Sequence, residues 1–184
     1  MARQAVLEAA DNLLVEVGFA AVTVEGIAAK AGVGKQTIYR WWKSKTDVLL
    51  DAFLEDAAQH LNPPDTGNLQ VDLGAHLYQC ARFFESSDAG AVFRALIGEA
   101  QHDAVLARQL RSKYLDQQRI RDRSVLVRAL ERGEVRADLD IDGVMDALIA
   151  PIHYRILVTG QAVTRRFTDD LVRRVLAQMG ITQT

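Results

Sequence analysis

The side chains best suited to chemistry with a macromolecule lie between Thr23 and Lys45, where the sequence is basic and aromatic. No acidic residue occurs between Glu25 and Asp47. The interval contains five cationic residues, namely Lys30, Lys35, Arg40, Lys43 and Lys45. Such a cluster suits a phosphate backbone, so the segment predicts contact with nucleic acid. A basic helix surface is also typical of an ordinary solvated face, and charge alone leaves that alternative open.

Two short helices joined by a turn are predicted to position these side chains. Thr23 is suited to cap the first helix, and Gly32 falls where a helix ends in the left-handed conformation. Ile38 and Trp42, four residues apart, indicate the buried side of the second helix. In a helix-turn-helix the second helix enters the major groove while flanking groups hold the DNA backbone. The spacing in this segment predicts that arrangement.

A second helix over residues 35–41 leaves six polar or aromatic side chains facing outward: Lys35, Gln36, Thr37, Tyr39, Arg40 and Trp41. Gln36 is suited to pair with adenine and Arg40 with guanine. Thr37, Tyr39 and Lys45 are better suited to phosphates. These roles are hypotheses for the six residues and Lys45.

The segment resembles the DNA-binding domain of the tetracycline-repressor (TetR) family of bacterial transcriptional regulators. The resemblance covers residues 3–55 and rests on residues at fixed offsets: Thr23, Ile27, Ala28, Ala31, Gly32, Val33, Thr37, Ile38, Tyr39, Trp42, Ser44 and Lys45. It implies that Thr37, Tyr39 and Lys45 hold phosphates. It also implies that Lys35, Gln36 and Arg40 lie nearest the bases.

Four positions depart from the family pattern or from helix preference. Glu25 stands where relatives often have a basic residue that contacts DNA, so we expect that contact to be absent or repulsive. Gly34 replaces the usual serine, which weakens capping by only about a few tenths of a kcal/mol. Trp41 stands where a polar residue is common, so its role is open. Gly26 inside a helix should cost about 1 kcal/mol relative to alanine.

Other chemistries find little support in the sequence. His60, His76, His102 and His153 form no pair at i and i+3 or i+4, which favours isolated polar or lining histidines over a metal site, and the same holds for Cys80. Ala29 and Gln36 exclude a phosphate-binding loop around Gly34 and Lys35. No catalytic motif appears, so we expect neither an enzyme nor a bound cofactor or metal.

Composition limits the class of protein. The chain has 184 residues and a formal charge of −2, so affinity for nucleic acid must come from a local patch. The single cysteine fits a reducing compartment, and no apolar run approaches the roughly 18 residues of a membrane span. We therefore expect a cytoplasmic protein with no membrane partner.

Helical periodicity recurs throughout, so the expected fold class is all-α. Four helices are predicted within residues 3–60. Residues 62–68 are dense in helix breakers, which places a boundary between a DNA-binding domain, 1–61, and a regulatory and dimerisation domain, 62–184. Further helices are predicted over 71–84, 91–100, 104–132, 143–159 and 167–179. Pro151 should kink the fourth of these.

Aromatic residues of the second domain are candidates for binding an effector: Tyr78, Phe83, Phe84, Phe93, His102 and Tyr114. Such residues more often belong to a hydrophobic core. The family resemblance implies an effector cavity among the middle helices, and aromatic side chains with a few polar groups suit such a cavity.

The C-terminal part resembles one branch of the same family, in which the last two helices pair with those of a second subunit. The apolar candidates for that interface include Leu148, Ile149, Ile152, Ile156, Leu171 and Val175. The alternative is that they close the core of their own subunit.

Together these features predict a homodimeric, ligand-responsive transcriptional repressor that binds a pseudo-palindromic operator in double-stranded DNA. Two other classes remain. One is a helical dimeric adaptor that recruits protein, and the other is an enzyme that uses a C-terminal cavity.

Overall fold

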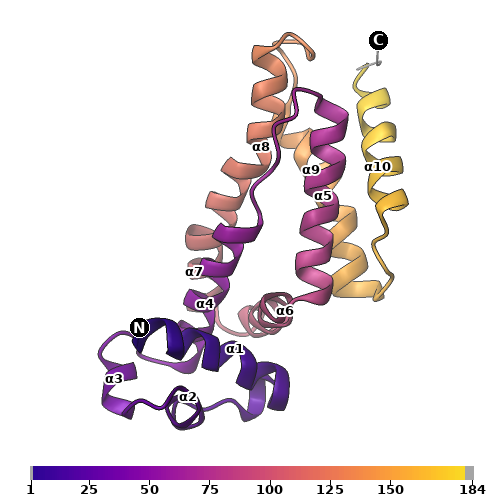
Figure 1. Cartoon of the computed structure of the whole chain (residues 1–184). Helices are drawn as coiled ribbons and strands as arrows, with labels where there is room; N and C mark the ends of the chain where they lie inside the picture. The colour runs from indigo at the N-terminus through magenta and orange to yellow at the C-terminus, as the bar shows by residue number, and fades with distance from the viewer. Residues whose placement is uncertain (1, 181–184) are drawn as a thin grey trace. The chain divides into compact units, whose positions relative to one another are not determined.

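The computed structural model describes residues 2–180, which contain helices and no strand, so the predicted all-α class is confirmed (Figure 1). The helices of the first part are α1 (Ala2–Ala21), α2 (Val24–Ala31), α3 (Lys35–Tyr39) and α4 (Lys45–His60). Those that follow are α5 (Leu69–Ser86), α6 (Asp88–Ala100), α7 (Ala104–Gln109), the π-helical η1 (Leu110–Leu115), α8 (Asp116–Glu131), α9 (Ile141–Tyr154), the π-helical η2 (Arg155–Thr159) and α10 (Arg165–Gln178).

The chain folds into two compact units. Unit 1 contains residues up to Gln59 together with Ser86–Leu115, and unit 2 contains His60–Glu85 together with residues from Asp116 onward. The helices α6 and α7 and the segment η1 therefore pack with the N-terminal helices. The division of the chain into functional domains at residues 61 and 62 stays a prediction.

Unit 1 is built on α1, which packs against both α2 and α6. Gly18 interrupts α1 with a positive φ of 75°, a conformation that glycine adopts without the strain a side chain would add. Gly18 breaks α1 without ending it, because helical residues continue to Ala21. An aromatic cluster joins α4, α6 and η1: the ring of Phe53 lies 5.3 Å from Phe93 and 4.7 Å from Tyr114.

Unit 2 has its core among α5, α8, α9 and α10, which lie alongside one another (Figure 1). One fully buried side chain from each of the four helices illustrates it: Leu77, Val125, Leu148 and Val172. Burying a side chain of this size stabilises a fold by about 1.5–3 kcal/mol. Pro151 lies inside α9, and the helix continues as the π-helical segment η2.

The proline-rich stretch before α5 is tied to unit 2 by polar contacts. The backbone N–H and the hydroxyl of Thr66 donate to Asp72 Oδ1 at 2.9 and 2.7 Å. Arg128 of α8 donates to the carbonyl of Pro64 at 2.5 Å. These contacts fix residues 64–66 against the two helices. Among residues 2–180, no helix combines the length and apolar character needed to cross a membrane.

Candidate nucleic-acid interface

The start of α2 is fixed by a side-chain cap and by close packing on α1. Thr23 Oγ1 accepts a hydrogen bond from the N–H of Gly26 at 3.0 Å, as predicted for an N-cap. A Cβ at position 26 would lie only 3.0 Å from Leu13 Cδ2 and 3.2 Å from Thr23 Oγ1. Gly26 therefore has a packing role that offsets its poor helix propensity.

The turn between α2 and α3 depends on Gly32, whose φ of 65° is left-handed as predicted. Val33 N–H donates to the carbonyl of Ala28 at 3.0 Å, and Gly32 N–H donates to Ala29 at 3.3 Å. This pair of bonds is the Schellman arrangement, which satisfies the last carbonyls of a helix. The turn thus sets the direction in which α3 leaves α2.

The inner side of α3 consists of Ile38, which is fully buried, and Trp42 in the following turn, which is 5 % exposed. Both predictions are confirmed. The Nε1 of Trp42 donates to Asp51 Oδ2 of α4 at 2.9 Å. Ser44 and Asp47 cap the start of α4, because the N–H of Asp47 donates to Ser44 Oγ at 3.1 Å. Residues 35–42, which we call the recognition segment, are therefore anchored to α4.

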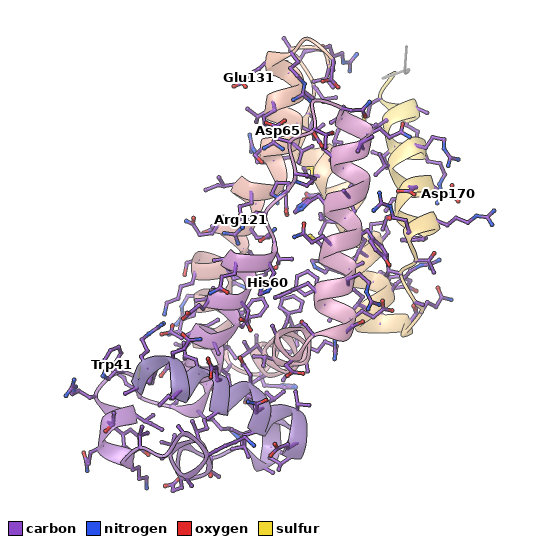
Figure 2. The ribbon with its side chains drawn as sticks, viewed as in Figure 1. Trp41, His60, Asp65, Arg121, Glu131 and Asp170 are labelled. Carbon is purple, nitrogen blue, oxygen red and sulfur yellow. The ribbon has the colours of Figure 1, made fainter. Side chains whose placement is uncertain are left out.

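The outer side of the segment presents Gln36, Tyr39, Arg40 and Trp41 to solvent. Tyr39 is 46 % and Trp41 51 % exposed, which are large fractions for aromatic side chains. The labelled Trp41 projects from the ribbon in Figure 2. Arg40 is exposed and forms no ion pair with any residue from 2 to 180. The four side chains supply amide, hydroxyl, guanidinium and indole donors on one surface.

Lys35 is exposed but already paired, because its ammonium forms an ion pair with the carboxylate of Glu25 in α2. The hydrogen bond between them lowers the pKa of Glu25 and raises the pKa of Lys35. A base contact by Lys35 has to compete with this partner. Glu25, which departs from the family pattern, thus acts directly on a predicted reading residue.

The other two predicted phosphate ligands are less accessible than Tyr39. Thr37 is half-buried. Lys45 is also half-buried, since its ammonium donates to the carbonyl of Phe19 at 2.7 Å and lies 4.5 Å from the centre of the Phe19 ring. The position of the Lys45 ammonium beside the C-terminal end of α1 is favourable, because helix C-termini carry partial negative charge. Two ammonium hydrogens remain for a phosphate.

Comparison with known proteins decides the family. The family model described as "Bacterial regulatory proteins, tetR family" matches residues 6–52, and "Tetracyclin repressor-like, C-terminal domain" matches residues 63–175. The chain belongs to the TetR family. The resemblance seen in the sequence is confirmed, and the protein is a DNA-binding transcriptional regulator of this family.

Sequence similarity to relatives extends over nearly the whole chain. The HTH-type transcriptional regulator YdeS of Bacillus subtilis is 41 % identical over 169 residues, which are 92 % of this chain and 85 % of YdeS. The DNA-binding transcriptional repressor TetR of Mycobacteroides abscessus is 29 % identical, with 91 % of this chain and 90 % of the repressor covered. The crystal structure of the TetR family transcription regulator SCO0332 superposes with a TM-score of 0.80 at 33 % identity, covering 100 % and 99 % of the two chains.

The predicted effector-binding residues fall in both units of this TetR-family protein. Phe93 and Tyr114 belong to unit 1, where they pack with Phe53 and are almost completely buried. The sequence alone gave no sign that these rings meet, because the three residues come from separate helical segments. His102 also belongs to unit 1 and is exposed. Its role as an effector ligand stays a prediction.

The remaining effector candidates lie in unit 2. Phe83 and Phe84 are buried, with ring centres 5.3 Å apart. Phe84 also makes an edge contact with His153 at 5.5 Å. Tyr78 is half-buried, and the guanidinium of Arg165 lies 5.5 Å from its ring. These contacts are typical of a packed core, and a ligand role for the three residues stays a prediction.

The predicted dimer residues differ in how much surface they leave for a partner. Four of them are buried in the core of a single chain: Leu148, Ile152, Leu171 and Val175. Ile149 and Ile156 are half-buried. Hydrophobic periodicity identified all six as inward-facing but could not separate burial within one subunit from burial between two.

His76 and Cys80 are not isolated, contrary to the expectation from the spacing of histidines alone. Both are buried on α5, and His76 Nε2 lies 2.7 Å from Asp122 Oδ1 of α8. Burial lowers the pKa of His76, but the interaction with Cys80 and the hydrogen bond to Asp122 outweigh it and raise the pKa to about 10. The signal in the sequence was the His–Cys spacing of four residues.

Proposed function

We propose that this TetR-family regulator is a dimeric repressor that binds a pseudo-palindromic operator and leaves it when an effector binds. The outer face of the recognition segment carries the proposal: Gln36, Tyr39, Arg40 and Trp41 are exposed, and the buried Ile38 and Trp42 hold them in place. Exposed donors and aromatic rings on an anchored helix suit the major groove and its flanking phosphates.

The roles within this face follow from side-chain chemistry. Gln36 and Arg40 can each make paired hydrogen bonds to a purine edge, which distinguishes adenine from guanine. Tyr39 and Thr37 each offer one hydroxyl donor and Lys45 offers an ammonium group, and such groups suit phosphate oxygens and carry no base preference. Lys35 contributes only after its ion pair with Glu25 opens. Trp41 offers an exposed indole ring beside these donors, and its role is open.

A second copy of the chain is the proposed partner of the C-terminal end of α9 and η2. Tyr154, Leu157 and Val158 are 58 %, 37 % and 70 % exposed, and their spacing puts them on neighbouring positions of one helical surface. Exposed apolar side chains gathered in one place are typical of an interface. Ile149 and Ile156, which are half-buried, extend the same segment.

The proposed response to an effector is a change in the separation of two recognition helices. They enter successive major grooves only when about one DNA turn, or a multiple of it, separates them. An effector that binds more tightly to a state with another separation shifts the population away from the operator. The shift cannot exceed the difference between its affinities for the two states.

Footprinting of the promoter region upstream of the gene tests the operator and the dimer together. We expect two protected half-sites about one helical turn apart and a complex that contains two chains. A single protected half-site with one chain bound would contradict the proposal. Replacing Tyr154 and Val158 with serine should weaken both dimerisation in sedimentation and the footprint.

The roles of individual residues can be separated by binding to a set of operator variants. Tyr39→Phe and Lys45→Ala should weaken binding to all sequences alike, whereas Gln36→Ala and Arg40→Ala should change base preference. Arg166→Ala is the matched control, because it removes an exposed charge from α10 of unit 2. Equal effects of all four changes would contradict the assignment of roles.

A further inference from the structure

A buried cluster in unit 2 brings together three side chains that bind transition metals. His76 and Cys80 lie one turn apart on α5, and Asp122 lies on α8. One ligand atom from each residue lies within 4.8 Å of the others. All three residues are buried, with His76 fully shielded from solvent. Imidazole, thiolate and carboxylate are the ligands of catalytic-type zinc sites, which have three protein ligands and an open fourth position.

The distances are close to those that a tetrahedral zinc ion needs. Cys80 Sγ lies 3.8 Å from His76 Nε2, and zinc–ligand bond lengths at a tetrahedral angle require about 3.6 Å. Asp122 Oδ1 lies 2.7 Å from the same Nε2, against a required separation of about 3.4 Å. An ion therefore fits if the Asp122 carboxylate oxygen moves about 0.7 Å farther from His76 Nε2.

Neighbouring side chains of α8 already orient the Asp122 carboxylate. Gln118 Nε2 donates to Asp122 Oδ1 at 2.6 Å. Arg121 in turn donates to Gln118 Oε1 at 3.0 and 2.7 Å, which fixes the amide with its nitrogen toward Asp122. Figure 2 labels Arg121 on α8. Outer contacts of this kind orient the ligands of metal sites and tune their affinity.

The three ligand residues come from α5 and α8, both of them helices of unit 2, and they leave the fourth position of a tetrahedral ion to a water molecule.

The energetics favour a function for this cluster over a purely structural one. A buried ion pair contributes little net stability, and apolar residues of similar volume often serve as well or better. An ion bound by a thiolate and an imidazole supplies binding energy that offsets the cost of burying these groups. On binding, the thiol proton of Cys80 and the proton between His76 and Asp122 both pass to solvent.

We propose that His76, Cys80 and Asp122 form a binding site for a Zn²⁺-type transition-metal ion in the regulatory part of the protein. The site is independent of the DNA-binding proposal, because none of its residues belongs to unit 1. An operator assay is therefore not needed to test it, and failure of either proposal leaves the other standing.

Titration of the reduced, chelator-free full-length protein with Co²⁺ tests the proposal, because a cobalt–thiolate bond has a characteristic charge-transfer absorption. We expect one Co²⁺ per chain, with an absorption band that excess Zn²⁺ removes by displacement. Cys80→Ser should abolish the band. Asp122→Asn and His76→Gln should weaken binding by about tenfold or more. His60→Gln is the matched control, since it removes an exposed imidazole elsewhere in unit 2 and should leave the band unchanged.

Three results would overturn the proposal: no thiolate band in the wild type, a band that survives Cys80→Ser, or equal loss of binding in His60→Gln. Variants of the cluster can fail to fold, so a measurement on the wild type is paired with the titration. Saturating Zn²⁺ should raise the melting temperature by roughly 5 °C, and a chelator should reverse the rise. An unchanged melting temperature would count against the site.

Discussion

The outer face of α3 and the His76 cluster use polar side chains in opposite ways. On α3 and its C-cap, Gln36, Tyr39 and Arg40 are exposed, and their donors can exchange water for another partner at little cost. Between α5 and α8, His76 and Asp122 are buried and depend on each other, because a buried charge without a partner is costly. Polar groups that meet a macromolecule are thus kept solvated, whereas those inside the fold must be paired by the fold itself.

The largest expected effect follows from breaking the buried pair. Asp122→Ala leaves His76 and Gln118 without their acceptor and should lower the free energy of unfolding by about 3–5 kcal/mol. Urea unfolding measures it. Replacing His76 and Asp122 together with leucine should cost much less, because no buried charge is then left unpaired. A cost below about 1 kcal/mol for Asp122→Ala would show that the two groups are not mutually dependent.

Within α3, neighbouring residues should separate stability from DNA binding. Ile38→Ala removes a fully buried side chain and should lower the free energy of unfolding by about 2–4 kcal/mol. Gln36→Ala, on the exposed side, should change it by no more than about 0.5 kcal/mol while altering operator preference. Thermal unfolding and a binding assay on the same samples check both. Equal destabilisation by the two changes would mean that α3 is not anchored as described.

Asp11 of α1 is a polar residue of unit 1 whose burial makes the stability of the fold depend on pH. Burial, with a smaller contribution from the charges of Asp56 and Asp88, raises its pKa to about 7, and Asp11 Oδ1 is buried without a hydrogen-bond partner. Its pKa in the unfolded chain is near 3.8. The folded state therefore holds the Asp11 proton more tightly than the unfolded chain does. Protonation of Asp11 stabilises the fold fully below about pH 4, and this stabilisation is lost as pH rises to about 7.

Asp11→Asn should remove this dependence. The variant should match the wild type near pH 4 and exceed its free energy of unfolding by roughly 1–3 kcal/mol near pH 8. Denaturant unfolding at the two pH values measures the difference. A difference between the two proteins that is the same at both pH values would contradict a shifted Asp11 carboxyl.

The smallest expected effect concerns the exposed ion pair of Glu25 and Lys35. Glu25→Gln removes a negative charge from the side that we propose faces DNA, and it releases the Lys35 ammonium. Operator affinity should rise about two- to fivefold, with a slightly steeper dependence on salt. The gain should disappear when Lys35→Ala is combined with Glu25→Gln. Weaker binding by Glu25→Gln would indicate that Glu25 itself contacts the operator.

The helix-turn-helix could be predicted because its determinants are local. The Thr23 cap, the left-handed Gly32 and the Ile38–Trp42 pair all lie within one short interval, and each has a distinct residue preference. Sequence did not indicate that Lys35 pairs with Glu25 or that Lys45 binds the Phe19 carbonyl. Those contacts depend on how α1, α2 and α3 pack, which side-chain types alone do not specify.

The His76 cluster was harder to predict, because Asp122 lies 46 residues from His76 and on another helix. Only the spacing of His76 and Cys80 was visible, and a search for pairs of histidines misses it. Sequence alone could not specify what covers Leu148 and Ile152, for another reason. Their apolar periodicity correctly predicted burial, but the same pattern occurs in the core of one subunit and in an interface between two.

The central claim is that the exposed face of α3 binds the DNA backbone and bases, and its salt dependence tests it most directly. Affinity for a promoter fragment should fall steeply, by about 10³-fold or more between 50 and 200 mM salt if the dimer makes six or more phosphate contacts. Lys45→Ala should make that dependence shallower, whereas Tyr39→Phe removes no charge and should weaken binding without changing the slope. An affinity that stays constant over this range, or a slope that Lys45→Ala leaves unaltered, would contradict the account.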